Sequence, residues 1–186
     1  MAVKEMVRSG GRSARIQAAV HRAVKDLSAE TERSDLTVPQ IAAYAGVTPS
    51  TIYRRWGDLQ GLLADVAVER LRPIADPDDT GATRTDLEIW AEQYLEEMSS
   101  EVGRGLLRDV LTSAADPDNS TQCWRYSHDQ LAVIAARAQA RGERPFDINE
   151  VIEVVVAPIV YHILFGDGEL TAADCRTLVA RVSSLA

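Results

Sequence analysis

Hydroxyl and guanidinium side chains are concentrated in one short segment, between Thr48 and Arg55. Hydroxyl groups can donate to phosphate oxygens, and a guanidinium can form two hydrogen bonds with the edge of a guanine. The N-terminus of a helix adds to this, because its free N–H groups attract phosphate. The sequence therefore predicts DNA contacts from the following residues: Thr37, Thr48, Pro49, Ser50, Thr51, Tyr53, Arg54 and Arg55.

Two short predicted helices position these groups. Thr37 is a suitable N-cap for a helix that Gly46 ends, and Thr48 with Pro49 begins a second helix that runs to Trp56. The apolar residues of the segment are spaced to pack inward: Ile41, Ala42, Val47, Ile52 and Trp56. Two short helices around a Gly-containing turn are typical of a helix-turn-helix, whose second helix enters the major groove.

Helical periodicity also dominates the remainder, so the fold class expected is all-α. The Pro-, Asp- and Gly-rich segment 73–83 predicts a domain boundary. We expect a DNA-binding domain over residues 1–72, with a basic arm over 1–12 and a linking helix over 58–72. A helical regulatory domain would cover 73–186, with helices near 87–98, 104–115, 121–140, 148–165 and 171–184.

The charge is divided unevenly between these two parts. The chain carries a net charge of −8, but residues 1–70 contain ten basic and eight acidic residues. That part is therefore +2, and the remainder is −10. A mildly basic end on an acidic body is expected when only the end touches phosphate. In the basic arm, Lys4, Arg8 and Arg12 are either DNA contacts or a polar tail.

Aromatic and apolar side chains on two predicted helices suggest a ligand pocket between them. The scarcity of aromatic residues, 5% of the chain, makes their concentration on these helices informative. The same side chains could instead simply fill a core. The residues expected to line the pocket are Trp90, Tyr94, Met98, Leu107, Leu111, Trp124, Ser127 and Leu131.

The segment 148–165 is apolar on nearly every side, which indicates a helix buried on every side. One small domain has too little surface to cover it, so we expect an interface with a second copy of the chain to bury the remainder. Pro158 should bend the helix. The residues expected at the interface are Val133, Ala136, Ala140, Val155, Ile159 and His162.

Several other classes of function find little support. There is no Gly-rich phosphate loop, no H-E-x-x-H and no nucleophile elbow, so an enzyme is not expected. Cys123 and Cys175 form no C-x-x-C and the three histidines show no metal spacing, so neither a metal nor a cofactor is expected. No apolar run approaches the ~20 residues of a membrane span, and the first residues lack the apolar stretch of a signal peptide. A cytoplasmic protein that binds no membrane is expected.

The segment 37–56 resembles the TetR family of regulators. Its residues follow the family pattern T-[VI]-x-x-I-A-x-x-A-G-V-[ST]-x-x-[TS]-[LI]-Y-x-[HRY]-[FW] in register. The matching residues are Thr37, Val38, Ile41, Ala42, Ala45, Gly46, Val47, Thr48, Thr51, Ile52, Tyr53, Arg55 and Trp56. Two positions depart from the family: Leu59 replaces a phosphate-binding Lys, and Glu32 replaces a Gly.

The resemblance implies a repressor that binds a palindromic double-stranded operator as a homodimer, in which the helices over 121–140 and 148–165 pair with their two-fold mates in a four-helix bundle. A small, mainly apolar inducer would release it by favouring a form whose two DNA-reading heads are badly spaced. Leu59 and the acidic total keep a second hypothesis open, a dimeric helical interaction protein without specific DNA binding.

Overall fold

The computed structural model describes residues 10–30, 32–112, 117–166 and 168–185, and the regular elements in these ranges are all helical. The all-α expectation is therefore confirmed. The elements are α1 (Gly10–Glu30), α2 (Val38–Ala45), α3 (Pro49–Trp56), α4 (Leu59–Arg70), α5 (Thr83–Ser99), α6 (Glu101–Thr112), α7 (Pro117–Arg141), α8 (Ile148–Val151), α9 (Ala157–Phe165) and α10 (Ala172–Val179). Short 3-10 turns cover Arg33–Asp35 and Ser183–Leu185, and a π-helical turn, Ile152–Val156, joins α8 to α9.

Helix ends differ from the sequence predictions in several places, and α5 begins at Thr83, ahead of the predicted 87. Helix α6 begins at Glu101, because the hydroxyl of Ser100 accepts from the N–H of Gly103 and caps the turn. Helix α7 begins at Pro117, ahead of the predicted 121. Helix α10 ends at Val179, whereas the prediction ran on to 184.

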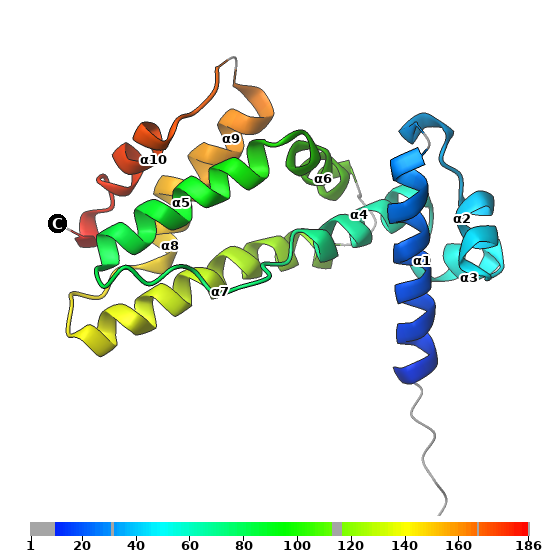
Figure 1. The fold of residues 1–186 in the computed structure, drawn as a ribbon, viewed down its shortest axis with the longest axis horizontal. Coiled ribbons are helices and arrows are strands. Elements are labelled where there is room, and N and C mark those ends of the chain that lie inside the picture. Colours follow the sequence, from blue (N-terminus) through cyan, green and yellow to red (C-terminus); the bar gives the residue numbers. More distant parts are fainter. Residues whose placement is uncertain (1–9, 31, 113–116, 167, 186) are drawn as a thin grey trace, which may run out of the picture.

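The chain forms two lobes that α4 connects (Figure 1). Helices α1, α2 and α3 form a head with α4, around a core that includes Val20, Ile41 and Ile52. Helices α5 to α10 form the body, around a second core. A third, smaller core joins α4 to α6 and α7 through Ala67, Val68 and Val110. Helix α4 is thus packed into both lobes.

The head has the predicted start and stop signals. Thr37 and Gln40 form a capping box, in which the Thr37 hydroxyl accepts from the Gln40 N–H and the Gln40 side chain accepts from the Thr37 N–H. Gly46 ends α2 with a φ of 67°, a left-handed conformation that favours glycine. Asp58 caps α4 by accepting from the N–H of Gly61 at 2.7 Å. Both ends of α2 and the start of α4 are therefore fixed by local contacts.

Ile148–Phe165 is one continuous helix through α8, the π turn and α9, and it packs against α5, α7 and α10. It is long and apolar enough by composition to cross a membrane, with a mean hydropathy of 1.7 over 18 residues. In length and apolar composition, this helix is therefore closer to a membrane span than was expected from the sequence. The wider π turn lies directly before Pro158, where the backbone lacks a donor N–H.

Residues 73–82 form an extended strap that returns from α4 to α5 along α7 (Figure 1). Gln130 and Arg137 on α7 donate to the strap carbonyls of Ala75 and Pro77, at 3.1 and 2.6 Å. The fully buried carboxylate of Asp86 on α5 accepts from the Thr80 N–H at 2.7 Å and from Arg141 at 2.9 Å. The segment expected to be a domain boundary is therefore bonded to two helices.

Candidate functional sites

The start of α3 presents a cluster of hydroxyl groups. The Thr48 hydroxyl lies 2.9 Å from that of Ser50 and 3.0 Å from that of Thr51. Thr48 occupies the N-cap position, but its side chain makes no capping hydrogen bond. Thr48, Pro49 and Ser50 are exposed, whereas Thr51 is half-buried. The cluster lies at the N-terminus of α3, where the helix dipole favours an anion such as phosphate, although Pro49 has no N–H and the Thr51 N–H donates to the Thr48 carbonyl at 3.0 Å.

Tyr53 and Arg54 extend this surface along α3. Both are exposed, Tyr53 by 49% of its surface. Thr37, also predicted to contact DNA, is exposed but committed to the capping box, where its hydroxyl donates to Gln40 at 2.6 Å. The surface therefore offers a phenol, a guanidinium and several hydroxyls on one short helix.

The Arg55 side chain is held by hydrogen bonds to α1. Its guanidinium donates to the carbonyl and the hydroxyl of Ser13 at 3.2 and 2.7 Å, and also to Gln17. It also lies over the Trp56 ring, 5.1 Å from the centroid. These contacts join the end of α3 to α1. These contacts favour a role for Arg55 in positioning α3, and its contact with DNA stays a prediction.

Asp65 on α4 connects this helix to α1 and α3. Its carboxylate accepts from the Trp56 indole N–H at 2.6 Å and from Gln17 at 3.3 Å, and lies 2.9 Å from His21. Burial acts to raise the pKa of Asp65, but the hydrogen bonds from His21 and Trp56 outweigh it and hold the pKa below its usual range. The carboxylate is therefore ionised at neutral pH and fixes the end of α3 on α4.

Leu59 and Gly61 fit the start of α4 to α3. Leu59, at the position where the family has Lys, packs against the head core instead of reaching outward. A Cβ on Gly61 would lie 2.2 Å from the Trp56 carbonyl oxygen, so any larger residue would push the two helices apart. The phosphate contact of that Lys is absent here, but the close seating of α3 on α4 is kept.

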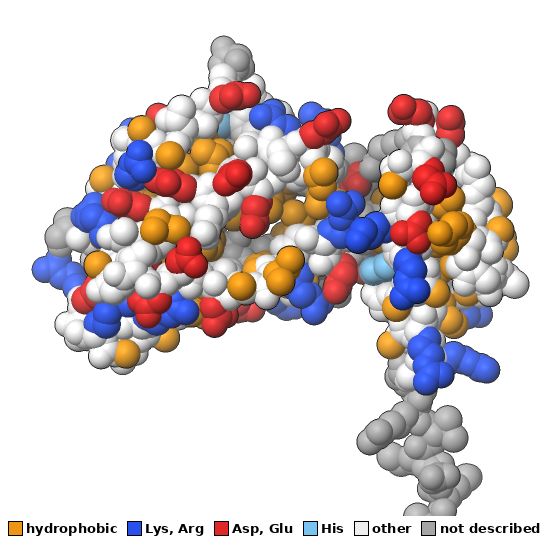
Figure 2. Space-filling view, in the orientation of Figure 1, with side chains coloured by type: hydrophobic (Ala, Val, Ile, Leu, Met, Phe, Trp, Pro, Cys, Tyr) orange, Lys and Arg blue, Asp and Glu red, His pale blue; other side chains and the backbone are white. Residues whose placement is uncertain are grey.

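Basic side chains gather at the N-terminal end of α1 (Figure 2). Arg12 and Arg15 are exposed there, on the helix that also binds Arg55. Arg12 is helical, so the predicted arm is shorter than 1–12. Lys4 and Arg8 lie outside the described residues. The positive charge of the head thus lies close to the exposed face of α3.

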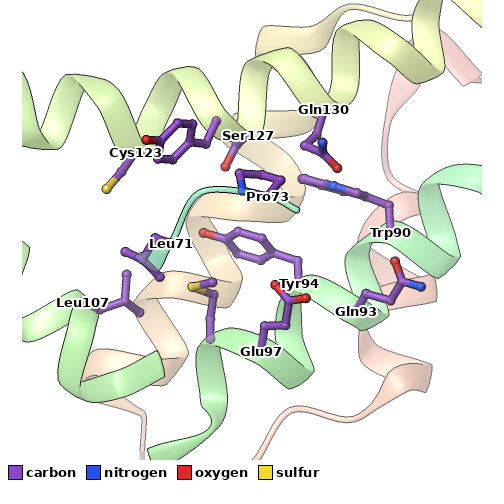
Figure 3. Close-up of a pocket in the computed structure, with 12 residues that line it drawn as sticks. Leu71, Pro73, Trp90, Gln93, Tyr94, Glu97, Leu107, Cys123, Ser127 and Gln130 are labelled. Atoms are coloured by element: carbon purple, nitrogen blue, oxygen red, sulfur yellow. The ribbon is translucent and has the colours of Figure 1, made fainter. Parts of the chain in front are cut away.

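A pocket lies in the body, between α5, α7 and the beginning of the strap (Figure 3). Trp90 and Tyr94 stack with their ring centroids 5.5 Å apart. The cavity measures about 90 Å³ and opens into a groove of about 680 Å³ that runs below the strap. Figure 2 shows hydrophobic side chains inside a hollow near the junction of the lobes. The cavity lining is Leu71, Pro73, Trp90, Gln93, Tyr94, Glu97, Met98, Leu107, Cys123, Tyr126, Ser127 and Gln130.

Five of the eight predicted pocket residues line this cavity: Trp90, Tyr94, Met98, Leu107 and Ser127. The other three do not. Leu111 is 63% exposed, Trp124 is 47% exposed beside His128, and Leu131 is completely buried in the core. The prediction assigned the whole apolar stripe of α6 and of α7 to the pocket. Only part of each stripe faces the cavity, because the rest of the stripe lies on a side of the helix that points elsewhere.

The sequence analysis missed seven lining residues. Gln93 and Glu97 follow Trp90 and Tyr94 by three residues on α5, so helical spacing could have indicated them. On α7, Gln130 follows Ser127 by three residues and Cys123 precedes it by four, so helical spacing could have indicated these two as well, whereas Tyr126 directly precedes Ser127. Leu71 and Pro73 carried no signal, because they reach the pocket only through the path of the strap.

The polar groups inside the pocket are neutral. Burial raises the pKa of Tyr94 to about 12, against the opposing effect of its hydrogen bond with Ser127. Burial also raises the pKa of the Cys123 thiol. The phenol and the thiol therefore remain protonated at neutral pH, and charge enters the lining only at Glu97.

The predicted dimer residues divide into two groups. Val155 and Ile159 are completely buried within the single chain, so they cannot form the surface of an interface. They face the core because α5, α7 and α10 pack on that side of the helix. Ala136, Ala140 and His162 are exposed, and Val133 is half-buried.

A different apolar surface appears on α9. Tyr161 and Phe165 are 63% and 72% exposed, and their ring centroids lie 5.3 Å apart. Ala157, one turn before Tyr161, is also exposed. Large exposed apolar groups placed together are typical of an interaction surface.

Two protein-family models match the chain. The model described as "Bacterial regulatory proteins, tetR family" matches residues 29–66, and the model described as "Tetracyclin repressor-like, C-terminal domain" matches residues 77–182. The first range contains α2 and α3, and the second contains the pocket helices α5 and α7. The two models therefore cover both sites described above.

Curated relatives are regulators of the helix-turn-helix type. The chain is 28% identical over 126 residues to the HTH-type transcriptional regulator AqdR of Rhodococcus erythropolis, in a match that spans 66% of this chain and 61% of that protein. It is 40% identical over 52 residues to the uncharacterized HTH-type transcriptional regulator Rv1556 of Mycobacterium tuberculosis, across 28% of this chain and 26% of that one. The matches thus leave a large part of each relative unaligned.

Solved structures share the fold over nearly the whole chain. The TetR family transcription regulator SCO0332 is 24% identical, with a TM-score of 0.64 over 92% of this chain and 98% of that one. A TetR transcriptional regulator from Agrobacterium tumefaciens is 20% identical, with a TM-score of 0.56 over 91% of this chain and 93% of that one. The arrangement of a helical head and a helical body is common to all three chains.

Proposed function

The chain belongs to the TetR family of bacterial regulatory proteins, and we propose that it is a DNA-binding transcription repressor that a small molecule releases from its operator. The observation that carries this proposal is the exposed face of α3. Its hydroxyl cluster, Tyr53 and Arg54 lie on a helix that Trp56 and Arg55 fix to the rest of the head. Such a helix suits the major groove.

The proposed DNA contacts are Thr48, Pro49, Ser50, Thr51, Tyr53 and Arg54. Arg12 and Arg15 would reach the neighbouring phosphates. Thr37 would take part through its backbone and its place at the start of α2. This assignment gives Arg54 the role of base or phosphate contact that the sequence had divided between Arg54 and Arg55.

A repressor of this kind works as a homodimer in the cytoplasm, and by binding alone, with no catalytic step. We place the dimer surface on α9, at Ala157, Tyr161 and Phe165, where the exposed apolar side chains lie. A two-fold axis would bring each patch onto its copy and place two α3 helices on a palindromic site. One apolar face of Ile148–Phe165 would then pack in the core, and the other would pack against the partner.

The pocket would sense the inducer through α4. Leu71 lines the pocket directly after α4, and the small core of Ala67, Val68 and Val110 seats α4 against α6. A ligand that prefers one position of α4 changes the position of the head on DNA. Ligand and DNA then lower each other's affinity by the same factor.

Footprinting on the intergenic DNA beside the protein's own gene tests the proposal. We expect protection of a palindromic site, with an affinity that falls steeply as salt rises, because phosphate contacts release counterions. Protection that is equal on unrelated DNA would support the alternative of an interaction protein without specific DNA binding.

A further inference from the structure

The pocket has aromatic walls from two helices. Trp90 and Tyr94 on α5 stack at an interplanar angle of 27°, and Tyr126 approaches from α7. Flat aromatic ligands stack on such rings, and the ring faces also attract cations. Met98 and Leu107 complete an apolar lining. The walls therefore favour a planar, mainly apolar ligand.

Glu97 is the single charged side chain in this lining. Two neighbouring polar residues are already engaged, since Gln93 donates to Asp78 at 3.2 Å and Gln130 donates to the Ala75 carbonyl at 3.1 Å. Within the described ranges, no hydrogen bond or ion pair involves the Glu97 carboxylate. Glu97 is exposed at the edge of the cavity, so a ligand cation that reaches it would gain the attraction of a solvent-exposed charge pair.

Glu97 lies at the mouth of the cavity. It borders both the cavity of about 90 Å³ and the groove of about 680 Å³, as Leu71, Pro73, Gln93 and Met98 also do. In Figure 3 its carboxylate lies between Tyr94 and Gln93, on the side of α5 that faces Pro73. A ligand with its ring among the aromatic walls would therefore have room for a short polar arm beside Glu97.

The arginines nearby leave this carboxylate uncompensated. Arg72 lies over the Tyr126 ring, 6.0 Å from the centroid, but is paired with Glu69 at 2.8 Å. Arg70 borders only the groove. Among the described residues, neither arginine forms an ion pair with Glu97. The negative charge at the mouth is thus available to a ligand.

The geometry points to a ligand class: an aromatic compound that carries a positively charged nitrogen on a short arm. Its ring lies among Trp90, Tyr94 and Tyr126, and its nitrogen donates to the Glu97 carboxylate. This inference rests on the proposed function, because it identifies the chemistry of the proposed inducer. It deepens the expectation of a mainly apolar inducer by adding one charge and its position.

Calorimetry with three indole probes tests the charge preference on the full chain without DNA. Tryptamine carries an ammonium, tryptophol a neutral hydroxyl and indole-3-acetate a carboxylate, on the same ring system. We expect tryptamine to bind most tightly and indole-3-acetate most weakly. Tighter binding of the acetate, equal binding of the three, or no tryptamine binding at millimolar concentrations would each overturn the inference.

Glu97→Gln identifies the responsible group, with Glu96→Gln as a matched control. Glu96 is the adjacent exposed carboxylate on α5 and borders the groove but not the cavity. Glu97→Gln should lower tryptamine affinity about fivefold, the scale of one solvent-exposed charge pair, and leave tryptophol affinity unchanged. Glu96→Gln should change neither. Equal losses in the two variants would overturn the role of Glu97.

The experiments distinguish a failure of the repressor function from a failure of the ligand class. The probe measurements need no DNA, so a charge preference without operator binding would contradict the repressor and leave the ligand class standing. Operator binding with no preference for tryptamine would contradict the ligand class and leave the repressor standing.

Discussion

The indole N–H of Trp56, the last residue of α3, donates to the carboxylate of Asp65 on α4 at 2.6 Å. This hydrogen bond joins the recognition helix to the helix that reaches the body. His21 and Gln17 of α1 meet the same carboxylate, so one side chain sets the relative positions of three helices. Asp65 is therefore a positioning residue for DNA binding, although it lies away from the exposed face of α3.

Asp65→Asn should destabilise the head by about 2 kcal/mol, because it weakens charge-assisted hydrogen bonds to partly buried donors. The depressed pKa of Asp65 sets the pH dependence. Its stabilisation is complete above the ordinary pKa of about 3.9 and is lost as the pH falls through the lower folded value. Urea unfolding of the wild-type protein and of Asp65→Asn between pH 7 and pH 3 measures how far their difference in unfolding free energy shrinks as the pH falls. Asp26→Asn is the control, since Asp26 contacts only exposed Tyr44 in this way. A constant difference across that range would contradict the assignment.

Arg54→Ala and Arg55→Ala should have different effects, although the two residues are adjacent. Arg54→Ala should weaken operator binding and reduce the slope of log affinity against log salt by about 1, with little change in stability. Arg55→Ala should lower the thermal stability of the head, because it removes the contacts to Ser13 and Gln17. Gel shifts at several salt concentrations and thermal melts separate the two. Identical profiles would show that the contacts of Arg55 to α1 do not persist on DNA.

Tyr161→Glu or Phe165→Glu should convert a dimer to a monomer, because each places a charge on the exposed apolar patch of α9. Analytical ultracentrifugation measures the change. Tyr44→Glu is the control, since Tyr44 is similarly exposed, at 56%, but lies on the head. Val155→Asp should instead unfold the protein, because Val155 is completely buried. A stable dimer in both α9 variants would refute this surface.

Asp86→Asn should release the strap from α5 and lower the free energy of unfolding by about 3 kcal/mol, the scale for breaking a buried ion pair. Asp78→Asn, on the exposed strap, serves as the control. The same network has a pH signature, because hydrogen bonds from Thr83 and Arg141 lower the pKa of Glu143 to about 2. Its contribution is complete above the ordinary pKa of about 4.3 and disappears as the pH falls toward 2. Asp86→Asn with wild-type stability at pH 7 would rule out this role.

Tyr94→Ala should alter the response to an inducer, whereas Trp124→Ala should not. Tyr94 lines the cavity, and Trp124 lies exposed outside it. Operator release measured against inducer concentration should shift its midpoint in the first variant alone. An unchanged midpoint together with a large loss of thermal stability would mean that Tyr94 only fills the core.

The local signals in the sequence were enough to predict the head. Thr37, Gly46, Thr48 and Asp58 lie at helix ends that follow from their own chemistry, and the apolar spacing of α2 and α3 determines their packing. The role of Arg55 was not predictable in this way. Its partners, Ser13 and Gln17, are 42 and 38 residues away, and only the crossing of α1 and α3 brings them together.

The body shows the same limit more strongly. Periodicity indicated that Trp90, Tyr94 and Met98 share a face, and they do line the pocket. It could not show which face of Ile148–Phe165 meets the core, because that helix is apolar nearly all round. Val155 and Ile159 were therefore assigned to a partner although α5, α7 and α10 cover them. Leu71, at the C-cap of α4, and Pro73, at the start of the strap, reach the pocket only through tertiary packing.

Asp65 and Leu71 lie only six residues apart along α4 and its C-cap, a rise of about 9 Å. One belongs to the network of the head, and the other lines the pocket. Among the described residues, α4 also packs against α6 and α7, through the small core of Ala67, Val68 and Val110. A chimera that joins this body to another head would therefore need to match few positions, those of α4 that face α6 and α7. The same arrangement allows the specificity for DNA and the specificity for ligand to diverge independently during evolution, with α4 as the shared joint.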